Sequence, residues 1–360
     1  MKTLLITEKY SVASALCDAI DLSIESCDIF CVHPHHVWRY KLQKLSFDQV
    51  PFVGEPPKVS NLLDSNHLFV PSPLHFVISG KSVWAGSVSA LMEQVETLKS
   101  NLTSGVYEQV VCIGDADPIG QLNIKRGLEL VEVPDGIGVS FIKSSSLYSE
   151  RLKYEYNNRS LINESDFSLV SGQLLKNKFD YWWNSNSAIV LSEAAKFAGL
   201  EADPVISKYE ALLMQHLDVT FKNSEFFESD LIRMMHRWVG TGKFKGEDFD
   251  YWYGLVSTSE RGRIVKQMQY RGFLSDSNGS LSITEKGRDF LRLLHPRSLD
   301  LDLPFRVEAW RIGQGGGEAT AKRYIRTFFG RQLRHQRKEM NKIRVERGKS
   351  SALKIESVDI

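Results

Sequence analysis

Apolar residues in the first part of the chain alternate between short continuous runs and helical spacing. Residues 3–7 and 109–114 are apolar runs typical of buried strands, and residues 11–20 place apolar side chains one helical turn apart. Residues 136–141 fit a closing strand, while residues 33–80, rich in His, Pro and aromatics, fit an insertion. Strands that alternate with helices predict an α/β domain with a mostly parallel sheet.

The pattern changes after residue 146. Helical periodicity dominates residues 168–217 and returns in residues 259–270. Residues 276–279 (Asp-Ser-Asn-Gly) then predict a hairpin turn, and Thr284 is a candidate N-cap for another helix. This order of helix, hairpin and helix predicts a mainly α-helical domain with a winged-helix element.

Composition is that of an ordinary soluble globular protein, with 42% apolar and 25% charged residues. The net charge of +1 hides an asymmetry, because residues 322–349 carry eleven Lys and Arg against two Glu. A basic tail on a near-neutral body indicates contact with nucleic acid, although a solvated surface helix would have the same composition. The residues expected to contact phosphates are Lys322, Arg323, Arg326, Arg331, Arg334, Arg337, Lys338, Lys342 and Arg344.

The N-terminus and the cysteines indicate a cytoplasmic protein. Glu8 and Lys9 interrupt the first apolar run before it could serve as a signal peptide, and no stretch is long enough to cross a membrane. Four cysteines in 360 residues do not form a disulfide framework, so we expect reduced thiols. The spacing from Cys27 and Cys31 to His33 is not that of a standard zinc finger, which favours buried thiols over a zinc site.

Two carboxylates follow the second apolar run directly, in the sequence Gly-Asp-Ala-Asp-Pro-Ile-Gly over residues 114–120. At the carboxyl end of a parallel strand, Asp115 and Asp117 could direct oxygen ligands into one crevice. Mg²⁺ prefers such oxygens, and a nucleic-acid phosphate would complete its coordination. An Asp-x-Asp at this position is equally common as simple turn chemistry.

The other strand-to-helix junction carries Glu8 and Lys9. A carboxylate beside an ammonium suits metal binding and compensation of phosphate charge. The alternative is that both are ordinary first-turn residues, with Glu8 favoured by the helix dipole. Taken together, the two junctions predict a site with Glu8, Lys9, Asp115 and Asp117 as catalytic residues and Glu8, Asp115 and Asp117 as Mg²⁺ ligands.

Both junctions, in this order, resemble the Toprim domain of type IA DNA topoisomerases. Four later segments are similar to that family in the family's order and extend the resemblance over most of residues 3–311: residues 45–51, 179–186 (including Phe179-Asp180-Tyr181-Trp182 and Asn186), 207–213 and 258–294. The resemblance implies a Toprim domain followed by a helical, winged-helix DNA-binding domain, and DNA as the partner.

The chain also departs from that family. The family's Arg-Glu-Gly-Glu after Asp-x-Asp is Pro-Ile-Gly-Gln at residues 118–121, which removes two acidic positions, and an expected Arg is replaced by Ile189. The similarity jumps from Val219 to Glu225, where the family carries its gate arch and catalytic Tyr-x-Arg. The resemblance is therefore to a truncated form that lacks the strand-passage gate and the tyrosine nucleophile.

The aromatic residues change this picture little. Trp182, Trp183 and Trp252 could stack on bases in a single-stranded groove, but their spacing favours a helical core. Tyr107 precedes its strand and should lie at the far end from the acidic crevice, whereas Tyr10 is placed near it. Other tyrosines, such as Tyr209, Tyr251 and Tyr253, lie in sequence that resembles scaffold, so no tyrosine is assigned as a nucleophile.

These observations predict a Toprim-like domain in residues 1–150, a helical domain in 151–311, and a Gly-rich joint with a basic tail in 312–360. The expected function is that of a topoisomerase IA-like protein that binds DNA, in single strands or at junctions, with an acidic site for Mg²⁺. It would be an accessory factor in replication, mobile-element or defence biology, with a protein partner left open. The alternatives are an Mg²⁺-dependent Toprim nuclease that uses a metal-activated water, and a topoisomerase subunit completed by a partner chain.

Overall fold

The structure is a computed structural model, and it divides by internal contacts into two compact units. It describes residues 2–23, 25–32, 42–56, 74–144, 146–203, 205–222, 224–241, 244 and 254–356. The first unit comprises residues 1–41, 55–178 and 310–314, and the second comprises 42–54, 179–309 and 315–360. Each unit is compact by its own internal contacts, and the expected division at residues 150 and 311 stays a prediction.

A six-stranded sheet forms the centre of the first unit, in the order β4-β3-β2-β1-β5-β6. Strands β2, β1, β5 and β6 are parallel, and β3 and β4 are antiparallel additions at one edge. The expected α/β domain with a mostly parallel sheet is thus confirmed. The strands are β1 (Lys2–Thr7), β2 (Cys27–Cys31), β3 (Leu74–Ile78), β4 (Lys81–Ala85), β5 (Tyr107–Gly114) and β6 (Gly138–Lys143).

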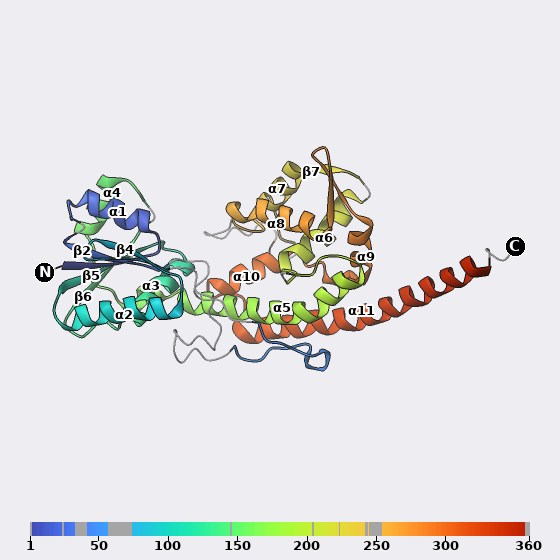
Figure 1. The fold of residues 1–360 in the computed structure, drawn as a ribbon, viewed down its shortest axis with the longest axis horizontal. Coiled ribbons are helices and arrows are strands. Elements are labelled where there is room, and N and C mark those ends of the chain that lie inside the picture. Colours follow the sequence, from blue (N-terminus) through green and yellow to red (C-terminus); the bar gives the residue numbers. More distant parts are fainter. Residues whose placement is uncertain are drawn as a thin grey trace. The chain divides into compact units, whose positions relative to one another are not determined.

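Helices cover both faces of this sheet (Figure 1). Helices α1 (Tyr10–Ala19) and α4 (Ser149–Asn157) pack together over one face, and α2 (Val88–Thr103) and α3 (Pro118–Val131) lie over the other. Alternate side chains of β1, β2, β3, β5 and β6 enter two separate cores, as the period of a strand requires. The result is a three-layer α/β/α arrangement.

The order of the strands creates a switch point at the carboxyl ends of β1 and β5. After β1 the chain adds β2 on one side, and it later places β5 on the other side of β1. The loops that leave β1 and β5 therefore run to opposite faces of the sheet (Figure 1). The sheet edge between them, here called the crevice, is the usual position of a ligand site in an open α/β sheet.

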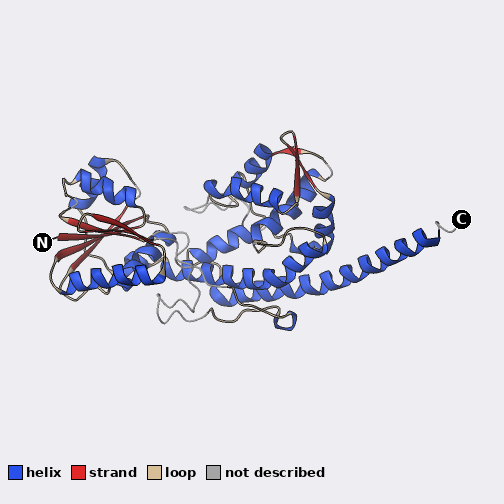
Figure 2. Cartoon of the chain, viewed as in Figure 1, coloured by secondary structure: helices blue, strands red, loops and turns tan. Residues whose placement is uncertain are grey.

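The second unit is mainly helical, with a three-stranded sheet in the order β7-β9-β8 (Figure 2). Helix α5 begins in the first unit and α10 ends there, so each crosses the boundary between the units. The helices and strands of the second unit are α5 (Val170–Phe197), α6 (Lys208–Phe221), β7 (Phe226–Phe227), α7 (Glu228–His236), α8 (Thr258–Tyr270), β8 (Leu274–Ser277), β9 (Ser280–Ile283), α9 (Glu285–Leu293), α10 (Leu303–Arg311) and α11 (Gly317–Glu356).

The expected helix, hairpin and helix are present as α8, β8–β9 and α9. Asn278 and Gly279 turn the hairpin with positive φ values of 55° and 86°, which an Asn-Gly pair adopts readily. The Thr284 hydroxyl accepts a hydrogen bond from the backbone N–H of Gly287 at 2.9 Å, so Thr284 caps α9 as expected. The assignment of these elements as a winged helix stays a prediction.

The basic segment is part of helix α11 and not a loose tail. One face of α11 is buried within the second unit, because apolar and amide side chains recur on it at helical spacing. Its buried residues are Ala321, Ile325, Phe329, Gln332, Leu333, Gln336, Met340 and Ile343. The composition of this segment hides the buried face, because the cations between these residues dominate it.

Several segments that resemble the family have structural roles in the second unit. Trp182 and Trp183 are buried, at 0% and 1% exposure, which confirms the core interpretation; Trp252 lies outside the described residues. Asn186 bonds twice to the backbone of Phe52, with its Nδ2 donating to the carbonyl and its Oδ1 accepting from the N–H, at 2.8 and 2.7 Å. Asn186 thus fixes the 42–54 segment on α5.

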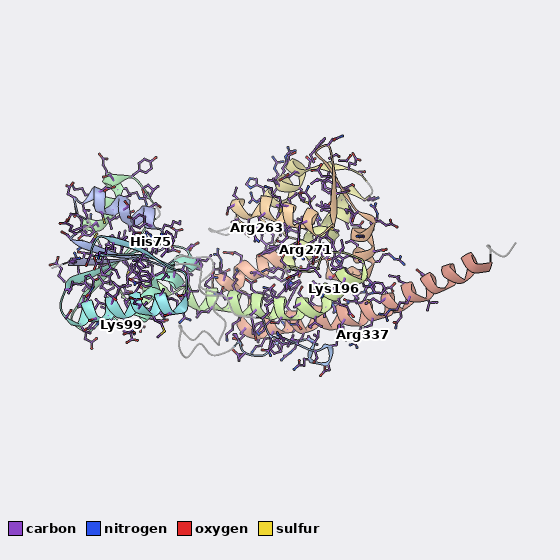
Figure 3. The ribbon with its side chains drawn as sticks, in the orientation of Figure 1. His75, Lys99, Lys196, Arg263, Arg271 and Arg337 are labelled. Carbon is purple, nitrogen blue, oxygen red and sulfur yellow. The ribbon has the colours of Figure 1, made fainter. Side chains whose placement is uncertain are left out.

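Arg271, labelled in Figure 3, is a buried cation of the second unit. Its Nε lies 2.7 Å from Oε1 of Glu210, and both side chains are almost fully buried. The guanidinium also donates to the backbone carbonyls of Glu201 and Val205. This network joins the start of α6 to the end of α8.

Among the described residues, no helix is long and apolar enough to cross a membrane.

Candidate functional site

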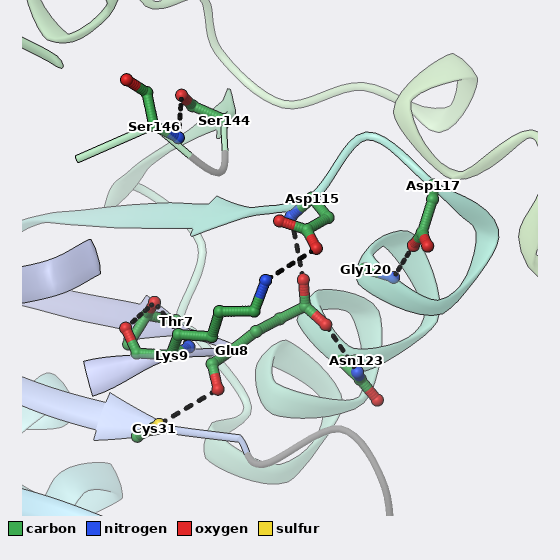
Figure 4. A network of polar contacts seen from close by, with 10 residues as sticks. All are labelled: Thr7, Glu8, Lys9, Cys31, Asp115, Asp117, Gly120, Asn123, Ser144 and Ser146. Atoms are coloured by element: carbon green, nitrogen blue, oxygen red, sulfur yellow. Dashed lines mark hydrogen bonds and ion pairs between the residues drawn. The ribbon is translucent and has the colours of Figure 1, made fainter. Parts of the chain in front are cut away.

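Glu8 and Lys9 lie in the turn between β1 and α1, and Asp115 begins the turn between β5 and α3 (Figure 4). The parallel register pairs Thr7 with Ile113, so the two turns leave the sheet side by side. The structure therefore brings together the two motifs that the sequence analysis combined.

Glu8 is a buried carboxyl group with two hydrogen-bond donors. Its Oε2 accepts from the backbone N–H of Asp115 and its Oε1 from Nδ2 of Asn123, each at 2.8 Å. Only 3% of the residue is exposed. Burial raises the pKa of Glu8 to about 7, and the nearby Asp115 and Asp117 charges add to this, against the two hydrogen bonds.

Asn123 is a site residue that the sequence analysis missed. It projects from the buried side of α3 and is 1% exposed, and its Oδ1 has no hydrogen-bond partner among the described residues. A polar residue next to Ile124 on the inward face of this helix is the only signal that the sequence carries. Without the fold, nothing connects that position to Glu8.

Lys9 and Asp115 form an ion pair at the mouth of the crevice. Nζ of Lys9 lies 2.9 Å from Oδ2 of Asp115, and the side chains are 47% and 32% exposed. Burial lowers the pKa of Lys9, but the hydrogen bond and the charge of Asp115 outweigh it, so this pKa lies above its usual value. Lys9 therefore carries a positive charge that a phosphate could share.

Asp117 has a structural role that the Asp-x-Asp pattern left open. Its Oδ1 accepts the backbone N–H of Gly120 at 2.8 Å, so it is the N-cap of α3, with Pro118 in the first turn. It still lies close enough to influence the pKa values of Glu8 and Lys9 by its charge. One carboxylate thus begins the helix and contributes negative charge to the crevice.

Gly120 is required by the close approach of the two turns. A Cβ atom at this position would lie 2.1 Å from the carbonyl oxygen of Asp115 and 2.9 Å from Oε2 of Glu8. Gln121, next along the chain, is buried, and its Oε1 accepts the backbone N–H of Leu169 at 2.9 Å. Gln121 therefore holds the chain in place at the start of α5.

The three expected Mg²⁺ ligands have separate partners in this structure. Glu8 binds a backbone N–H and an amide, Asp115 pairs with Lys9, and Asp117 caps α3. Across the described part of the chain, no group of three His, Cys, Asp or Glu side chains is arranged to hold a metal ion. Among the oxygens of these three carboxylates, Oδ1 of Asp115 and Oδ2 of Asp117 have no described hydrogen bond. These two atoms could bind a cation. Mg²⁺ binding stays a prediction.

The tyrosines near the sheet lie as the sequence analysis expected. Tyr107 begins β5, opposite Lys2, at the far end from the crevice, and its hydroxyl donates to Asp28. The ring of Tyr10, beside Lys9, packs against His75 with ring centroids 4.5 Å apart. Tyr251 and Tyr253 lie outside the described residues.

The cysteines are buried free thiols. Cys27 lies 3.5 Å from Cys17 between sulfur atoms, and Cys31 Sγ donates to the carbonyl of Glu8 at 3.2 Å. Burial raises the pKa of the Cys31 thiol to about 12. His33, the next residue in the zinc alternative, lies outside the described residues.

The expected phosphate contacts gather on the exposed face of α11, opposite its buried face. Lys322 is half-buried and pairs with Glu318, and Lys342 pairs with Glu339. The other seven are exposed, and none of them forms an ion pair with a carboxylate that the structure describes. These seven, here called the α11 cations, are Arg323, Arg326, Arg331, Arg334, Arg337, Lys338 and Arg344.

No protein-family model and no curated protein matches the sequence. Among solved structures, the chain is similar to full-length topoisomerase I from Thermotoga maritima, at 14% identity and a TM-score of 0.35. The match covers 66% of this chain and 31% of that one, so this chain matches about a third of the length of the topoisomerase. A likeness of this extent carries no argument about function, which has to come from the geometry of the chain itself.

Proposed function

We propose that this chain is a topoisomerase IA-like DNA-binding protein, without a strand-passage gate, that holds single strands or junctions as an accessory factor. The observation that carries the proposal is the row of α11 cations. Seven exposed cations without carboxylate partners among the described residues remain on a helix whose opposite face is firmly packed. A partner that supplies many negative charges would compensate them.

The spacing of the α11 cations suits a nucleic-acid backbone. From Arg323 to Arg344 the helix rises about 30 Å, at about 1.5 Å per residue. DNA phosphates repeat along one strand every ~3.4 Å, so an extended run of phosphates could contact several of these cations at once. A rigid helix also presents them without the cost of ordering a flexible tail.

The crevice at β1 and β5 is proposed as a second contact with DNA. Lys9 could bind a phosphate directly, while Asp115 and Asp117 would bind it through Mg²⁺, which would supply the positive charge. This second contact is supported by the unfavourable environment of Glu8. Its carboxyl group is buried and lies near the charges of Asp115 and Asp117, and its pKa therefore rises to about 7. Structures that keep such an unfavourable group usually use it.

The experiment measures binding of labelled single-stranded DNA over a range of salt concentrations. Exchange of Arg323, Arg326, Arg334 and Lys338 for Gln should weaken binding and lower the slope of log affinity against log salt by about 3, at about 0.7 for each phosphate that is no longer neutralised. The control exchanges Arg233 and Arg263 for Gln, since both are exposed but already pair with Asp or Glu. An unchanged slope in the α11 variant would refute the phosphate contacts.

A nuclease is the second candidate, and the observation that favours it is again Glu8. A carboxyl group with a pKa of about 7 can accept or release a proton at neutral pH, as a general acid or base must. Incubation of supercoiled plasmid and single-stranded DNA with Mg²⁺ separates the functions. Fragments would support the nuclease, binding without cleavage supports the accessory factor, and relaxation would require a gate from another chain.

A further inference from the structure

Three aromatic rings form a row from the candidate site to the edge of the sheet. Tyr10 contacts His75 with ring centroids 4.5 Å apart, and His75 stacks on Trp84 at 4.3 Å with an interplanar angle of 5°. Nε2 of His75 lies 2.8 Å from the Ser82 hydroxyl, which fixes the orientation of the middle ring. His75 is labelled in Figure 3.

The strand register explains why this row lies beside the crevice. Thr7 on β1 pairs with Cys31 on β2, Cys31 with His75 on β3, and His75 with Trp84 on β4. Trp84 is therefore three strands from Thr7, or about 14 Å at the usual strand spacing. That distance equals about four nucleotides of a stacked strand, so one bound strand could reach both Trp84 and Lys9.

Trp84 is an unusual tryptophan for this chain. It is 61% exposed, whereas Trp182, Trp183, Trp238 and Trp310 are at most 5% exposed. Helix α1 covers the inner strands β1 and β2 on this face, and β4 is the edge strand. One side of the indole is thus backed by His75, and a large part of the ring remains in contact with solvent.

The geometry points to Trp84 as a stacking platform for an unpaired base of single-stranded DNA, about four nucleotides along the strand from the phosphate held at Lys9. Indole rings stack on every base, because every base has a π-face, and this mode needs no hydrogen-bond code. His75 backs the platform as a neutral ring, since burial lowers its pKa. The inference rests on the proposed function and names the strand type that this part of the chain selects.

The test compares Trp84→Ala and Trp84→Phe with the wild-type full chain, by fluorescence anisotropy of a labelled oligothymidine and of a labelled blunt duplex. Trp84→Ala should bind the oligothymidine at least about fivefold more weakly, and Trp84→Phe should keep most of the affinity. Duplex affinity should not change. Tyr154→Ala is the matched control, because Tyr154 is 69% exposed in the same unit but lies on α4.

A second readout guards against variants that fail to fold. The difference in tryptophan emission between wild type and Trp84→Phe is the emission of Trp84. Oligothymidine should quench this emission when it binds the wild type. If wild type binds the oligothymidine and Trp84→Ala binds it equally well, the platform is refuted while the proposed function stands. Equal losses for duplex and oligothymidine would also overturn it. If wild type binds no DNA, both the inference and the proposed function fail.

Discussion

Glu8→Gln is the substitution that tests the candidate site most directly. The variant keeps the shape of the side chain and removes its ability to ionise. Its Oε1 can accept the backbone N–H of Asp115 as Glu8 does, and its Nε2 can donate to Oδ1 of Asn123 once that amide rotates. The same rotation moves Nδ2 of Asn123 to the position in which Oδ1 has no described partner in the wild type, so the number of buried amide atoms without a partner does not change.

The size of the expected stability difference between Glu8→Gln and wild type follows from the pKa of Glu8, which rises from 4.5 to about 7 on folding. Below pH 4.5 the group is protonated in both states. Between pH 4.5 and about 7 the carboxyl group ionises in the unfolded chain while it stays protonated in the folded chain, so the folded state loses stability over this range and the loss levels off above it. One pKa unit is about 1.36 kcal/mol, and the loss by pH 8 is therefore about 3 kcal/mol.

The assay is urea denaturation of both proteins at pH 5 and pH 8. Glu8→Gln should be more stable than wild type by up to about 3 kcal/mol at pH 8, and by less than about 1 kcal/mol at pH 5. Glu108→Gln, at an exposed position on β5, is the control for general effects of charge. A difference between Glu8→Gln and wild type that is the same at both pH values would refute the argument.

Individual side-chain partners lead to three further predictions. Asp117→Ala should destabilise the chain by about 1 kcal/mol in thermal or urea unfolding, and Asp117→Asn should not, because Asn also caps helices well. Arg271→Ala should cost about 3–5 kcal/mol in urea unfolding, since Glu210 would remain buried without its partner; a loss below about 1 kcal/mol would contradict the buried pair. No covalent adduct with single-stranded DNA and Mg²⁺ should appear on denaturing gels, and a band that Tyr10→Phe abolishes would make Tyr10 a nucleophile.

The first unit could be predicted well because its elements are short and strongly patterned. The runs at residues 3–7 and 109–114 became β1 and β5, and the parallel sheet followed from their alternation with helices. The segment around residues 33–80 was harder. Its part at 74–78 forms the antiparallel strand β3, and residues 33–41 and 57–73 lie outside the described residues.

The long-range contacts could not be predicted, because each joins residues whose local sequence is uninformative. Asn123 reaches Glu8 across 115 positions, and Gln121 reaches Leu169 across 48. The role of helix α11 was also hard to predict. A count of its charges indicates a basic tail, and the buried face becomes visible only when residues are compared at helical spacing.

The Asp-x-Asp motif shows why the site could be located but its chemistry could not. Asp115 and Asp117 are two positions apart, yet one forms an ion pair across the crevice and the other caps a helix. Composition cannot separate these roles, because the carboxylate that suits a metal also suits an N-cap. Glu8 differs, since neither a cap nor an exposed ion pair accounts for its burial. Burial of this acid, close to two other acids, is costly to the fold, and Glu8 is therefore the residue of this site that most strongly indicates a function.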